Sequence, residues 1–201
     1  MTENVATQLW LVRHGATEWS RSGQHTSVTD LPLLPDGEED ARRVGERLRD
    51  VDFKLVLTSP RRRARDTAAG AGFPDAEVDD NLVEWAYGPG EGLTSDQIRD
   101  IVPGWRIWTH GAADFERDGF GPGETIDEAS ARLQNVVDRV RASGVENALV
   151  FGHGHSLRAL SIKWLGLDMS LAKHFPLQTG TLSILGYEKD NPAIIRWNAE
   201  S

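Results

Sequence analysis

Residues 8–15 read QLWLVRHG, an apolar run that ends in an arginine, a histidine and a glycine. The apolar part, residues 8–12, is typical of a buried strand, and Gly15 suits the tight turn that must follow it. The same pattern occurs twice more, because KLVLT at residues 54–58 precedes Ser-Pro and ALVF at residues 148–151 precedes Gly-His-Gly-His. We therefore expect three buried strands, each ending in a polar, ionisable segment.

Four segments around these strands have the apolar spacing of helices. They span residues 35–51, residues 60 to 70 or 72, residues 125–142 and residues 157–165. Ser59 is the expected N-cap of the second helix, and Pro60 is its expected first residue. Residues 181–185 and 193–197 read as two closing strands. This alternation predicts an α/β fold, a three-layer sandwich whose mostly parallel central sheet is flanked by helices.

The composition is that of an ordinary globular protein, with 39% hydrophobic and 26% charged residues in a chain of 201. We expect a single domain over residues 1–201. The chain has no cysteine, which excludes disulfides, thiolate catalysis and cysteine-ligated metal sites. Its net charge of −9 argues against a nucleic-acid-binding surface, so an anionic ligand needs a local basic cluster.

The sequence also bears on location and partners. No apolar run approaches the roughly 20 residues that cross a bilayer, and residues 1–15 lack the basic and apolar regions of a secretory signal. We therefore expect a cytoplasmic protein without a membrane partner, and the sequence leaves a homodimer open.

The polar segments that follow the three strands are expected to meet. In a parallel sheet the ligand site lies beyond the carboxyl ends of the strands. Arg13 follows the first strand, residues 59–63 follow the second, and residues 153–155 follow the third. A lone histidine is more often structural than functional. His14 and His153 both stand beside glycines at predicted strand ends, which favours a shared function.

An arginine cluster lies at the start of the second helix. Positive charge is unfavourable there, by roughly 0.3–1 kcal/mol per group. A solvated cationic face is the plain interpretation of Arg61, Arg62 and Arg65. A helix N-terminus with an inward arginine also binds anions. At least one arginine of residues 61–65 is therefore a candidate phosphate ligand, together with Arg13.

Glu84 is a candidate proton donor. It is either an exposed loop carboxylate or, if Trp85 and Tyr87 partly bury it, a general acid or base. A nucleophilic histidine, arginines on phosphoryl oxygens, a second histidine and a carboxyl group together fit phosphoryl transfer. The sequence has no P-loop motif and no acidic cluster with two-metal spacing. We therefore expect a phosphoenzyme route that uses neither a metal nor a cofactor.

Four segments, in this order, resemble the motifs of the histidine phosphatase superfamily, also called the phosphoglycerate-mutase-like family. They are LVRHGATEW at residues 11–19, TSPRRRARDTA at residues 58–68, LVEWAYG at residues 82–88 and FGHGHSLRAL at residues 151–160. The resemblance spans nearly the whole chain. It implies the phosphoglycerate-mutase-like α/β sandwich and an enzyme that acts on a small-molecule phosphate ester.

The resemblance also implies a role for each matching residue. His14 would be phosphorylated during turnover, and Glu84 would protonate the leaving alcohol and then activate water. Arg13, Arg63 and His153 would form the phosphate pocket. The resemblance thereby selects Arg63 from the arginine cluster, whereas spacing alone does not show which arginine binds phosphate.

Residues 22–33 and 105–108 are most similar to the sedoheptulose-bisphosphatase-like and bacterial acid phosphatase branch of this family. The segment between the motifs, residues 88–123, is shorter than in the cofactor-dependent mutases. We therefore predict a metal-independent phosphomonoesterase of small phosphorylated metabolites, with sugar phosphates or bisphosphates favoured. The alternatives are a phosphoglycerate mutase and, from a different class, a non-catalytic phospho-ligand-binding module.

Residues 88–123 are expected to form a small cap or lid insertion. The mixed-polarity stretch after residue 110 is bounded by glycines, as in loops that close over a substrate. Trp105 and Trp108 are three residues apart and would share one face of a helix. We expect these two side chains to pack in the core or against the cap.

Three residues depart from the family pattern near the substrate. Ser20 stands where asparagine is frequent, and Ser27 stands where glycine is usual and would bring a side chain to the pocket rim. His155 either contacts the substrate or caps the helix that follows it. The candidate substrate and phosphate ligands are therefore Arg13, Ser20, Thr26, Arg63, His153, Gly154 and His155.

Overall fold

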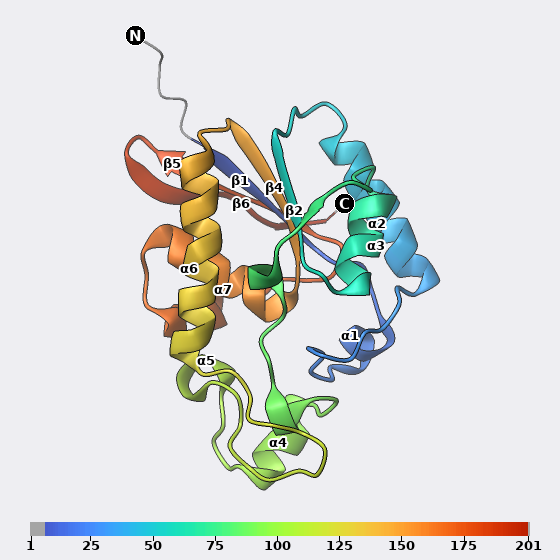
Figure 1. Ribbon diagram of the computed structural model, residues 1–201, viewed down its shortest axis with the longest axis vertical. Helices are drawn as coiled ribbons and strands as arrows, with labels where there is room; N and C mark the ends of the chain where they lie inside the picture. Colours follow the sequence, from blue (N-terminus) through green and yellow to red (C-terminus); the bar gives the residue numbers. More distant parts are fainter. Residues whose placement is uncertain (1–6, 201) are drawn as a thin grey trace.

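The computed structural model describes residues 7–200, and a six-stranded sheet forms the centre of this part of the chain (Figure 1). Its strands are β1 (Gln8–Arg13), β2 (Leu55–Thr58), β3 (Glu77–Val78), β4 (Asn147–Gly152), β5 (Leu182–Glu188) and β6 (Asn191–Ala199). They lie in the order β3-β2-β4-β1-β5-β6. β1 to β4 run parallel to one another, whereas β5 and β6 are antiparallel to their neighbours. The mostly parallel sheet expected from the sequence is confirmed.

Helices cover both faces of this sheet. The helices of the described residues are α1 (Glu18–Ser22), α2 (Pro35–Leu48), α3 (Arg62–Gly70), α4 (Ser95–Ile101), α5 (Ile107–His110), α6 (Ile126–Ser143) and α7 (Gly154–Leu165), with 3₁₀ helices at Asp80–Leu82, Gly88–Gly90 and Met169–His174. α6 and α7 lie on one face of the sheet, and α2 and α3 lie on the other (Figure 1). No helix in the described part of the chain is long and apolar enough to cross a membrane.

Alternating strand residues supply the two halves of the core. Successive side chains of a strand point to opposite faces of a sheet. Leu9 and Leu11 on β1 belong to the apolar cluster that includes α6 and α7, whereas Val12 belongs to the cluster that includes α2 and α3. These two apolar layers, one on each side of the sheet, confirm the three-layer sandwich.

The helix after β2 begins two residues later than predicted. α3 begins at Arg62, so Ser59 is not its N-cap and Pro60 is not its first residue. The backbone N–H of Arg62 donates instead to Oδ1 of Asp30, 2.8 Å away, in a loop far earlier in the chain. A carboxylate at this position accepts a hydrogen bond from an otherwise free N–H group, and its negative charge interacts favourably with the positive end of the helix dipole. The predicted cap is wrong because the group that accepts from the first turn, the Asp30 carboxylate, is remote in sequence.

α7 begins at Gly154, three residues before the predicted start at residue 157. Its first turn is capped by the side chain of Glu84, which accepts hydrogen bonds from the backbone N–H groups of His155 and Ser156. α2 ends at Leu48 instead of residue 51. The sequence also misses α1 and β3, which are too short to show a clear periodicity.

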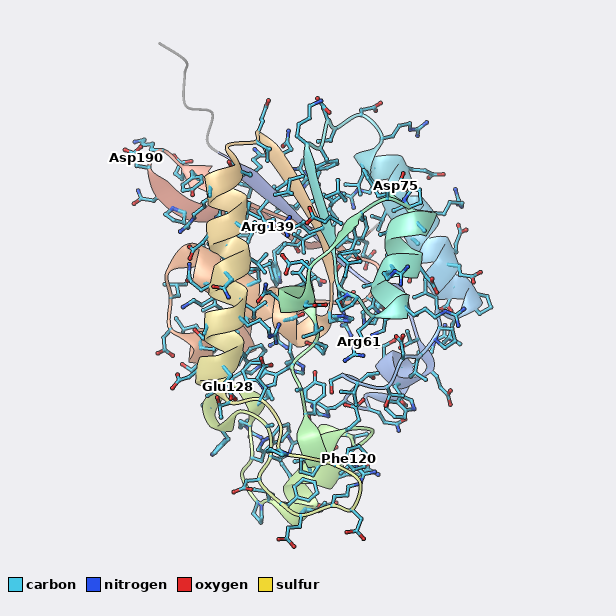
Figure 2. The ribbon with its side chains drawn as sticks, viewed as in Figure 1. Arg61, Asp75, Phe120, Glu128, Arg139 and Asp190 are labelled. Carbon is cyan, nitrogen blue, oxygen red and sulfur yellow. The ribbon has the colours of Figure 1, made fainter. Side chains whose placement is uncertain are left out.

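The segment 88–123 contains α4 and α5 and lies at the end of the molecule towards which β1 runs (Figure 1). The loop after α5, which carries Phe120, lies at this same end (Figure 2). Trp105 precedes α5, so it shares no helix with Trp108, but both side chains are buried in the core. The expected core packing of the two tryptophans is confirmed, and the use of this segment as a lid stays a prediction.

Candidate active site

The three polar segments meet at the carboxyl ends of β1, β4 and β2, which are neighbours in the sheet. Arg13 on β1 pairs with Gly152 on β4, and β2 ends one residue earlier, where Thr58 pairs with Phe151. The next residues, His14, Ser59 and His153, therefore leave the sheet side by side. The ring centroids of His14 and His153 are 5.3 Å apart. The convergence of these segments that the strand-end rule predicts is thus confirmed.

A cavity of about 190 Å³ opens at this point. Of the residues predicted from the sequence, its wall contains Arg13, His14, Ser20, Thr26, Glu84, Gly154 and His155. Arg63 and His153 are buried and do not line the cavity, but both act on His14, which does. The ring of His153 lies against that of His14, and the charge of Arg63 acts on the His14 imidazole. All the predicted site residues therefore belong to one region.

His14 is held as a neutral imidazole. The ring is 4% exposed, and its Nδ1 lies 2.8 Å from the carbonyl oxygen of Gly15. A carbonyl oxygen only accepts hydrogen bonds, so Nδ1 carries the ring proton and Nε2 keeps its lone pair. Burial, together with the charges of Arg13 and Arg63, holds the pKa of His14 well below its usual value. A neutral imidazole with a free Nε2 is the form that acts as a nucleophile.

Arg63 is the arginine of its cluster that turns inward. It is 1% exposed, whereas Arg62 and Arg65 are exposed to solvent, as the solvated-face interpretation predicts. Arg61, which that interpretation also included, is half-buried. Its Nη1 and Nη2 donate to the carbonyl oxygens of Thr29 (3.2 Å) and Thr26 (2.9 Å). These carbonyls fix the direction of the guanidinium group. Burial thus agrees with the family resemblance in selecting Arg63.

A buried carboxylate, that of Glu91, holds the loop that orients Arg63. Glu91 is 2% exposed and accepts hydrogen bonds of 2.5 to 3.0 Å from the backbone of Ser27 and Thr29 and from the Ser27 hydroxyl. Ser27 is therefore drawn into the interior, and its predicted place at the pocket rim is wrong. Sequence reasoning missed Glu91 in this position, because its partners are more than 60 residues away.

Several nitrogen atoms at the site are buried and have no hydrogen-bond partner within residues 7–200. They are Nε of Arg13, Nε of Arg61, Nε of Arg63 and Nδ1 of His153. Gly154 leaves room for the Arg13 side chain, since a Cβ atom there would lie 3.2 Å from Cζ of Arg13. Arginine nitrogens only donate hydrogen bonds. A phosphoryl group, with several acceptor oxygens and negative charge, satisfies such a set of donors.

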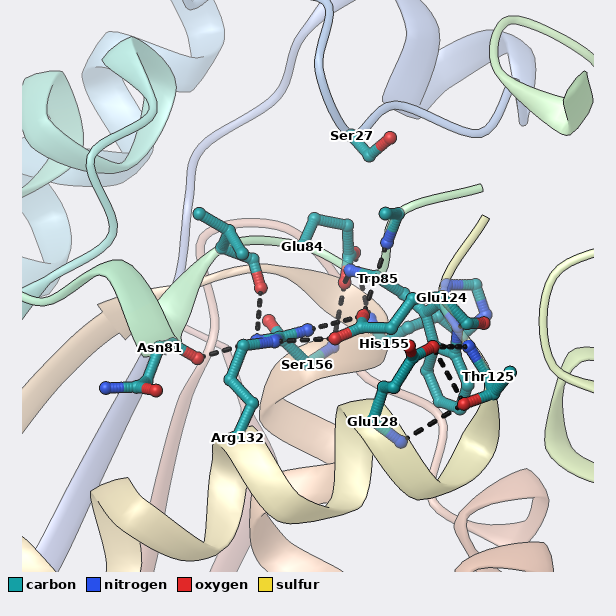
Figure 3. Close-up of polar contacts among 12 residues, drawn as sticks. Ser27, Asn81, Glu84, Trp85, Glu124, Thr125, Glu128, Arg132, His155 and Ser156 are labelled. Carbon is teal, nitrogen blue, oxygen red and sulfur yellow. Dashed lines mark hydrogen bonds and ion pairs between the residues drawn. The ribbon is translucent and has the colours of Figure 1, made fainter. Parts of the chain in front are cut away.

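Glu84 places its carboxylate at the N-terminus of α7 (Figure 3). Its side chain is buried, and Oε1 accepts hydrogen bonds from the backbone N–H groups of Trp85 (2.9 Å) and Ser156 (2.8 Å). Oε2 accepts a single backbone hydrogen bond, from His155 at 3.0 Å. The carboxylate is therefore fixed in direction, and Oε2, with one hydrogen bond, has an electron pair free in a residue that lines the cavity.

An ion pair fixes the loop that carries Glu84 (Figure 3). The guanidinium of Arg132 on α6 contacts both carboxylate oxygens of Glu124, at 2.7 and 2.8 Å. The same guanidinium donates to the carbonyl oxygens of Asn81 (2.6 Å) and Val83 (3.0 Å). A bidentate pair of this kind is directional, so it positions the backbone on the N-terminal side of Glu84. Sequence reasoning missed this pair.

The hydroxyl groups of Ser20 and Thr26 are already engaged. The Ser20 hydroxyl donates to the Thr17 carbonyl (2.9 Å) and accepts from the Thr17 N–H (2.8 Å), which completes a capping box for α1. The Thr26 hydroxyl donates to the Gln24 carbonyl at 3.2 Å. Both residues line the cavity, and Thr26 also orients Arg63 through its carbonyl.

The side chain of His155 forms part of the cavity wall and makes no helix cap. Its Nδ1 lies 2.6 Å from the Tyr87 hydroxyl, and its ring stacks on that of His25 at 5.8 Å with an interplanar angle of 5°. Tyr87 packs edge-on against His25 at 4.6 Å. Sequence reasoning missed His25 and the contact of Tyr87 with His155, because these rings come together only in the tertiary structure.

Arg158 adds a second positive charge to the wall, separate from the arginines at the strand ends. Its guanidinium lies 4.6 Å from the Trp108 ring and donates through Nε and Nη2 to the Ala172 carbonyl. Within residues 7–200 it forms no salt bridge. Burial lowers the pKa of Arg158 to about 10. The sequence could have indicated this position, because Arg158 lies one helical turn after Gly154, which was already a candidate ligand.

We expect the free energy of unfolding to fall as the pH drops below about 6.5, the value at which histidines of the unfolded chain titrate. Burial holds the pKa values of His14, His153 and His155 well below this value in the folded protein. Below about pH 6.5 the unfolded chain therefore binds more protons than the folded one. The free energy of unfolding then falls by up to about 1.4 kcal/mol per pH unit for each of these histidines.

Urea denaturation from about pH 7.5 to about pH 5.5 measures this dependence. The variant His155→Gln serves as the matched comparison, because removal of one such histidine should reduce the slope. A free energy of unfolding that stays constant across this range would contradict the expectation.

The comparisons with known proteins agree with this geometry. The family model of the histidine phosphatase superfamily (branch 1) matches residues 9–200. An acid phosphatase of Mycobacterium tuberculosis is 36% identical over 184 residues, which cover 90% of this chain and 87% of that protein. The sedoheptulose 1,7-bisphosphatase of Saccharomyces cerevisiae is 36% identical over 191 residues, which cover 79% of this chain and 68% of that protein.

Solved structures share the fold as well. The structure of a Mycobacterium tuberculosis open reading frame product superposes with a TM-score of 0.87 at 33% identity, covering 96% of this chain and 98% of that one. Family model, relatives and fold therefore agree along almost the whole chain. This chain belongs to the histidine phosphatase superfamily, and it is a phosphatase.

Proposed function

We propose that the protein is a phosphomonoesterase that works through a phosphohistidine on His14. The observation that carries this proposal is the 2.8 Å distance from Nδ1 of His14 to the Gly15 carbonyl oxygen, which assigns the ring proton to Nδ1 and leaves Nε2 free to attack phosphorus. Arg13, Arg63 and His153 surround it with buried nitrogens that suit phosphoryl oxygens. The charge of the phosphoryl group is balanced by these side chains, so the proposed steps draw on no metal ion.

The first step transfers the phosphoryl group to the enzyme. Nε2 of His14 forms a bond to phosphorus while the bond from phosphorus to the alcohol oxygen breaks. Protonated Glu84 gives its proton to that oxygen, and the alcohol leaves. The free electron pair of Glu84 Oε2, which accepts only one backbone hydrogen bond, is where this proton would reside.

The second step returns the enzyme to its starting state. A water molecule attacks the phosphohistidine, the bond from phosphorus to Nε2 breaks, and its electron pair returns to the imidazole. The Glu84 carboxylate accepts a proton from the attacking water. Inorganic phosphate leaves, His14 is neutral again, and Glu84 is again protonated for the next cycle.

Small phosphorylated sugars are the substrate class that the cavity supports. The wall beyond the strand ends is polar and aromatic, with His25, Tyr87 and His155 able to meet hydroxyl groups. Arg158 adds a cation there, which favours an alcohol that carries a second anionic group, as in a bisphosphate. The names of the two relatives, an acid phosphatase and a sedoheptulose 1,7-bisphosphatase, support this class. A cytoplasmic location and a homodimer stay predictions of the sequence.

Replacing Arg158 by glutamine is expected to raise the KM for a sugar bisphosphate by about 10- to 100-fold, the worth of a charge-assisted hydrogen bond of about 1.5–3 kcal/mol. The KM for an aryl phosphate should rise much less, because its alcohol has no second charge. Steady-state kinetics on both substrates measures the difference.

Arg141→Gln is the matched control for this variant. Arg141 also lies over a tryptophan ring, that of Trp164 at 4.9 Å, and also donates to a backbone carbonyl, but it does not line the cavity. Its replacement should leave the ratio of the two KM values unchanged. Equal increases for bisphosphate and aryl phosphate in Arg158→Gln would contradict a role in recognising the alcohol.

Phosphate release from a substrate panel tests the proposed function. The panel contains an aryl phosphate, 3-phosphoglycerate and several sugar mono- and bisphosphates, with a chelator present and His14→Ala as the blank. Release from one sugar bisphosphate far above the others would support the proposal and name the substrate class. Transfer of phosphate between positions of phosphoglycerate without release would indicate a mutase instead. Binding without turnover, unchanged in His14→Ala, would indicate a binding module.

A further inference from the structure

We propose that Ser59 sets the tautomer of His153, so that His153 presents an Nδ1–H donor to the phosphoryl group. Ser59 follows β2 and His153 follows β4, and the two strands are neighbours in the sheet. Both side chains are fully buried, and Oγ of Ser59 lies 2.7 Å from Nε2 of His153. Ser59 is thus a positioning residue. Its effect on turnover rests on the proposed function, whereas the tautomer itself does not.

The hydrogen bonds of the Ser59 hydroxyl decide which atom donates. A serine hydroxyl has one proton to donate and two electron pairs that accept. Its Oγ already accepts from the backbone N–H of Arg61 at 3.3 Å. Within residues 7–200, Oγ has two hydrogen-bond partners, this N–H group and Nε2 of His153. The imidazole nitrogen is therefore the one partner that can accept the hydroxyl proton.

The opposite arrangement leaves a buried donor without a partner. If Nε2 carried the ring proton, Oγ would accept from both neighbours and its own proton would point at no acceptor. Leaving a buried polar group unsatisfied costs free energy because it has also lost its hydrogen bonds to water. Donation from Ser59 to Nε2 avoids this loss. The ring proton of His153 is then on Nδ1.

The ring of His153 carries one proton in the folded protein. Burial and the charges of Arg63 and Arg13 hold the pKa of His153 well below its usual value. With Nε2 occupied by Ser59, Nδ1 is the nitrogen left to meet a ligand, and it has no partner within residues 7–200. A protonated Nδ1 donates to a phosphoryl oxygen, whereas a bare Nδ1 would repel it. Ser59 thus makes His153 a donor that matches the arginines.

The test is the ¹⁵N spectrum of the His153 ring in the full-length protein, assigned by the signal that disappears in His153→Gln. A protonated and a bare ring nitrogen have well-separated chemical shifts. We expect a protonated Nδ1 and a bare Nε2 in wild-type protein, with and without inorganic phosphate. Ser59→Ala should lose this preference. A wild-type His153 protonated at Nε2 overturns the proposal, even for an enzyme that turns over by the proposed steps.

Kinetics test the consequence. Ser59→Ala should lower kcat by roughly 10- to 100-fold with a much smaller change in KM, as for other groups that orient a functional histidine. Ser59→Thr, which keeps the hydroxyl, should recover most of the lost rate. Ser161→Ala is the matched control, since the Ser161 hydroxyl is also buried but donates only to the Leu157 carbonyl at 2.8 Å. Wild-type kcat in Ser59→Ala, or an equal loss in Ser161→Ala, would contradict a positioning role.

The two proposals fail in different measurements. If wild-type protein releases no phosphate from any substrate, the proposed function fails, but the ¹⁵N spectrum still decides the tautomer. If the protein is an active phosphatase and His153 is protonated at Nε2, the inference about Ser59 fails alone. The wild-type spectrum also decides the question should Ser59→Ala prove unable to fold.

Discussion

His14→Ala is expected to reduce phosphate release by roughly 10⁴-fold or more, because removing a nucleophile leaves only the catalysis that comes from binding and charge. Nε2 of His14 is the one protein atom in the proposed steps that forms a bond to phosphorus, and the proposed steps give this role to no other side chain. His153 is its neighbour at 5.3 Å, but its Nε2 is occupied by Ser59. A phosphoenzyme formed with radiolabelled substrate should therefore be absent in this variant.

The fold should survive this replacement. His14 makes one hydrogen bond to the Gly15 carbonyl, and loss of such a bond costs about 1 kcal/mol. The control is His174→Ala, which removes an exposed imidazole that does not line the cavity and should keep full activity. Near-wild-type release by His14→Ala, with an unchanged unfolding midpoint, would remove His14 from the mechanism.

Glu84→Gln is expected to slow turnover of an alkyl phosphate by about 10²–10⁴-fold, the usual worth of a general acid or base. Glutamine keeps the shape of the side chain but has no proton to give to the alcohol. With an aryl phosphate the leaving group needs less protonation, so the phosphoenzyme should form quickly and then accumulate. Rapid-quench measurements should show a burst of the aryl alcohol followed by slow release of phosphate.

The Glu84→Gln variant also perturbs structure, because an amide oxygen cannot accept all three backbone hydrogen bonds that the carboxylate accepts. Glu91→Gln is the matched control, since Glu91 is another buried carboxylate that accepts backbone N–H groups but does not line the cavity. Its effect should be the same for aryl and alkyl phosphates. A Glu84→Gln variant with equal losses on both substrates and no burst would place the proton donor elsewhere.

The sequence by itself determined the sheet and the place of the site. Local apolar runs mark β1, β2 and β4, because a buried strand must be apolar on both faces. The parallel arrangement then brings the residues after each strand to one edge, which is how His14 and His153 are found without a structure. The family motif adds the choice of Arg63, since the match is a property of the sequence alone.

The tertiary structure decided the boundaries of the helices at the site. α3 and α7 are each capped by a carboxylate from a distant segment, Asp30 and Glu84 respectively. A cap of this kind leaves no trace in the residues next to the helix, so local rules place the first turn incorrectly. Ser59 shows the consequence, because its hydroxyl contacts Nε2 of His153 and the backbone N–H of Arg61, which comes before the first helical residue.

The tertiary structure also decided which residues orient the functional groups and form the cavity wall. Glu91 holds the loop of Arg63, and the Arg132–Glu124 pair holds the loop of Glu84. Arg158 likewise becomes part of the cavity wall through its position over the Trp108 ring. Periodicity and motifs report what a residue does within its own element. These contacts instead join segments far apart in sequence, and their geometry exists only once the layers have packed.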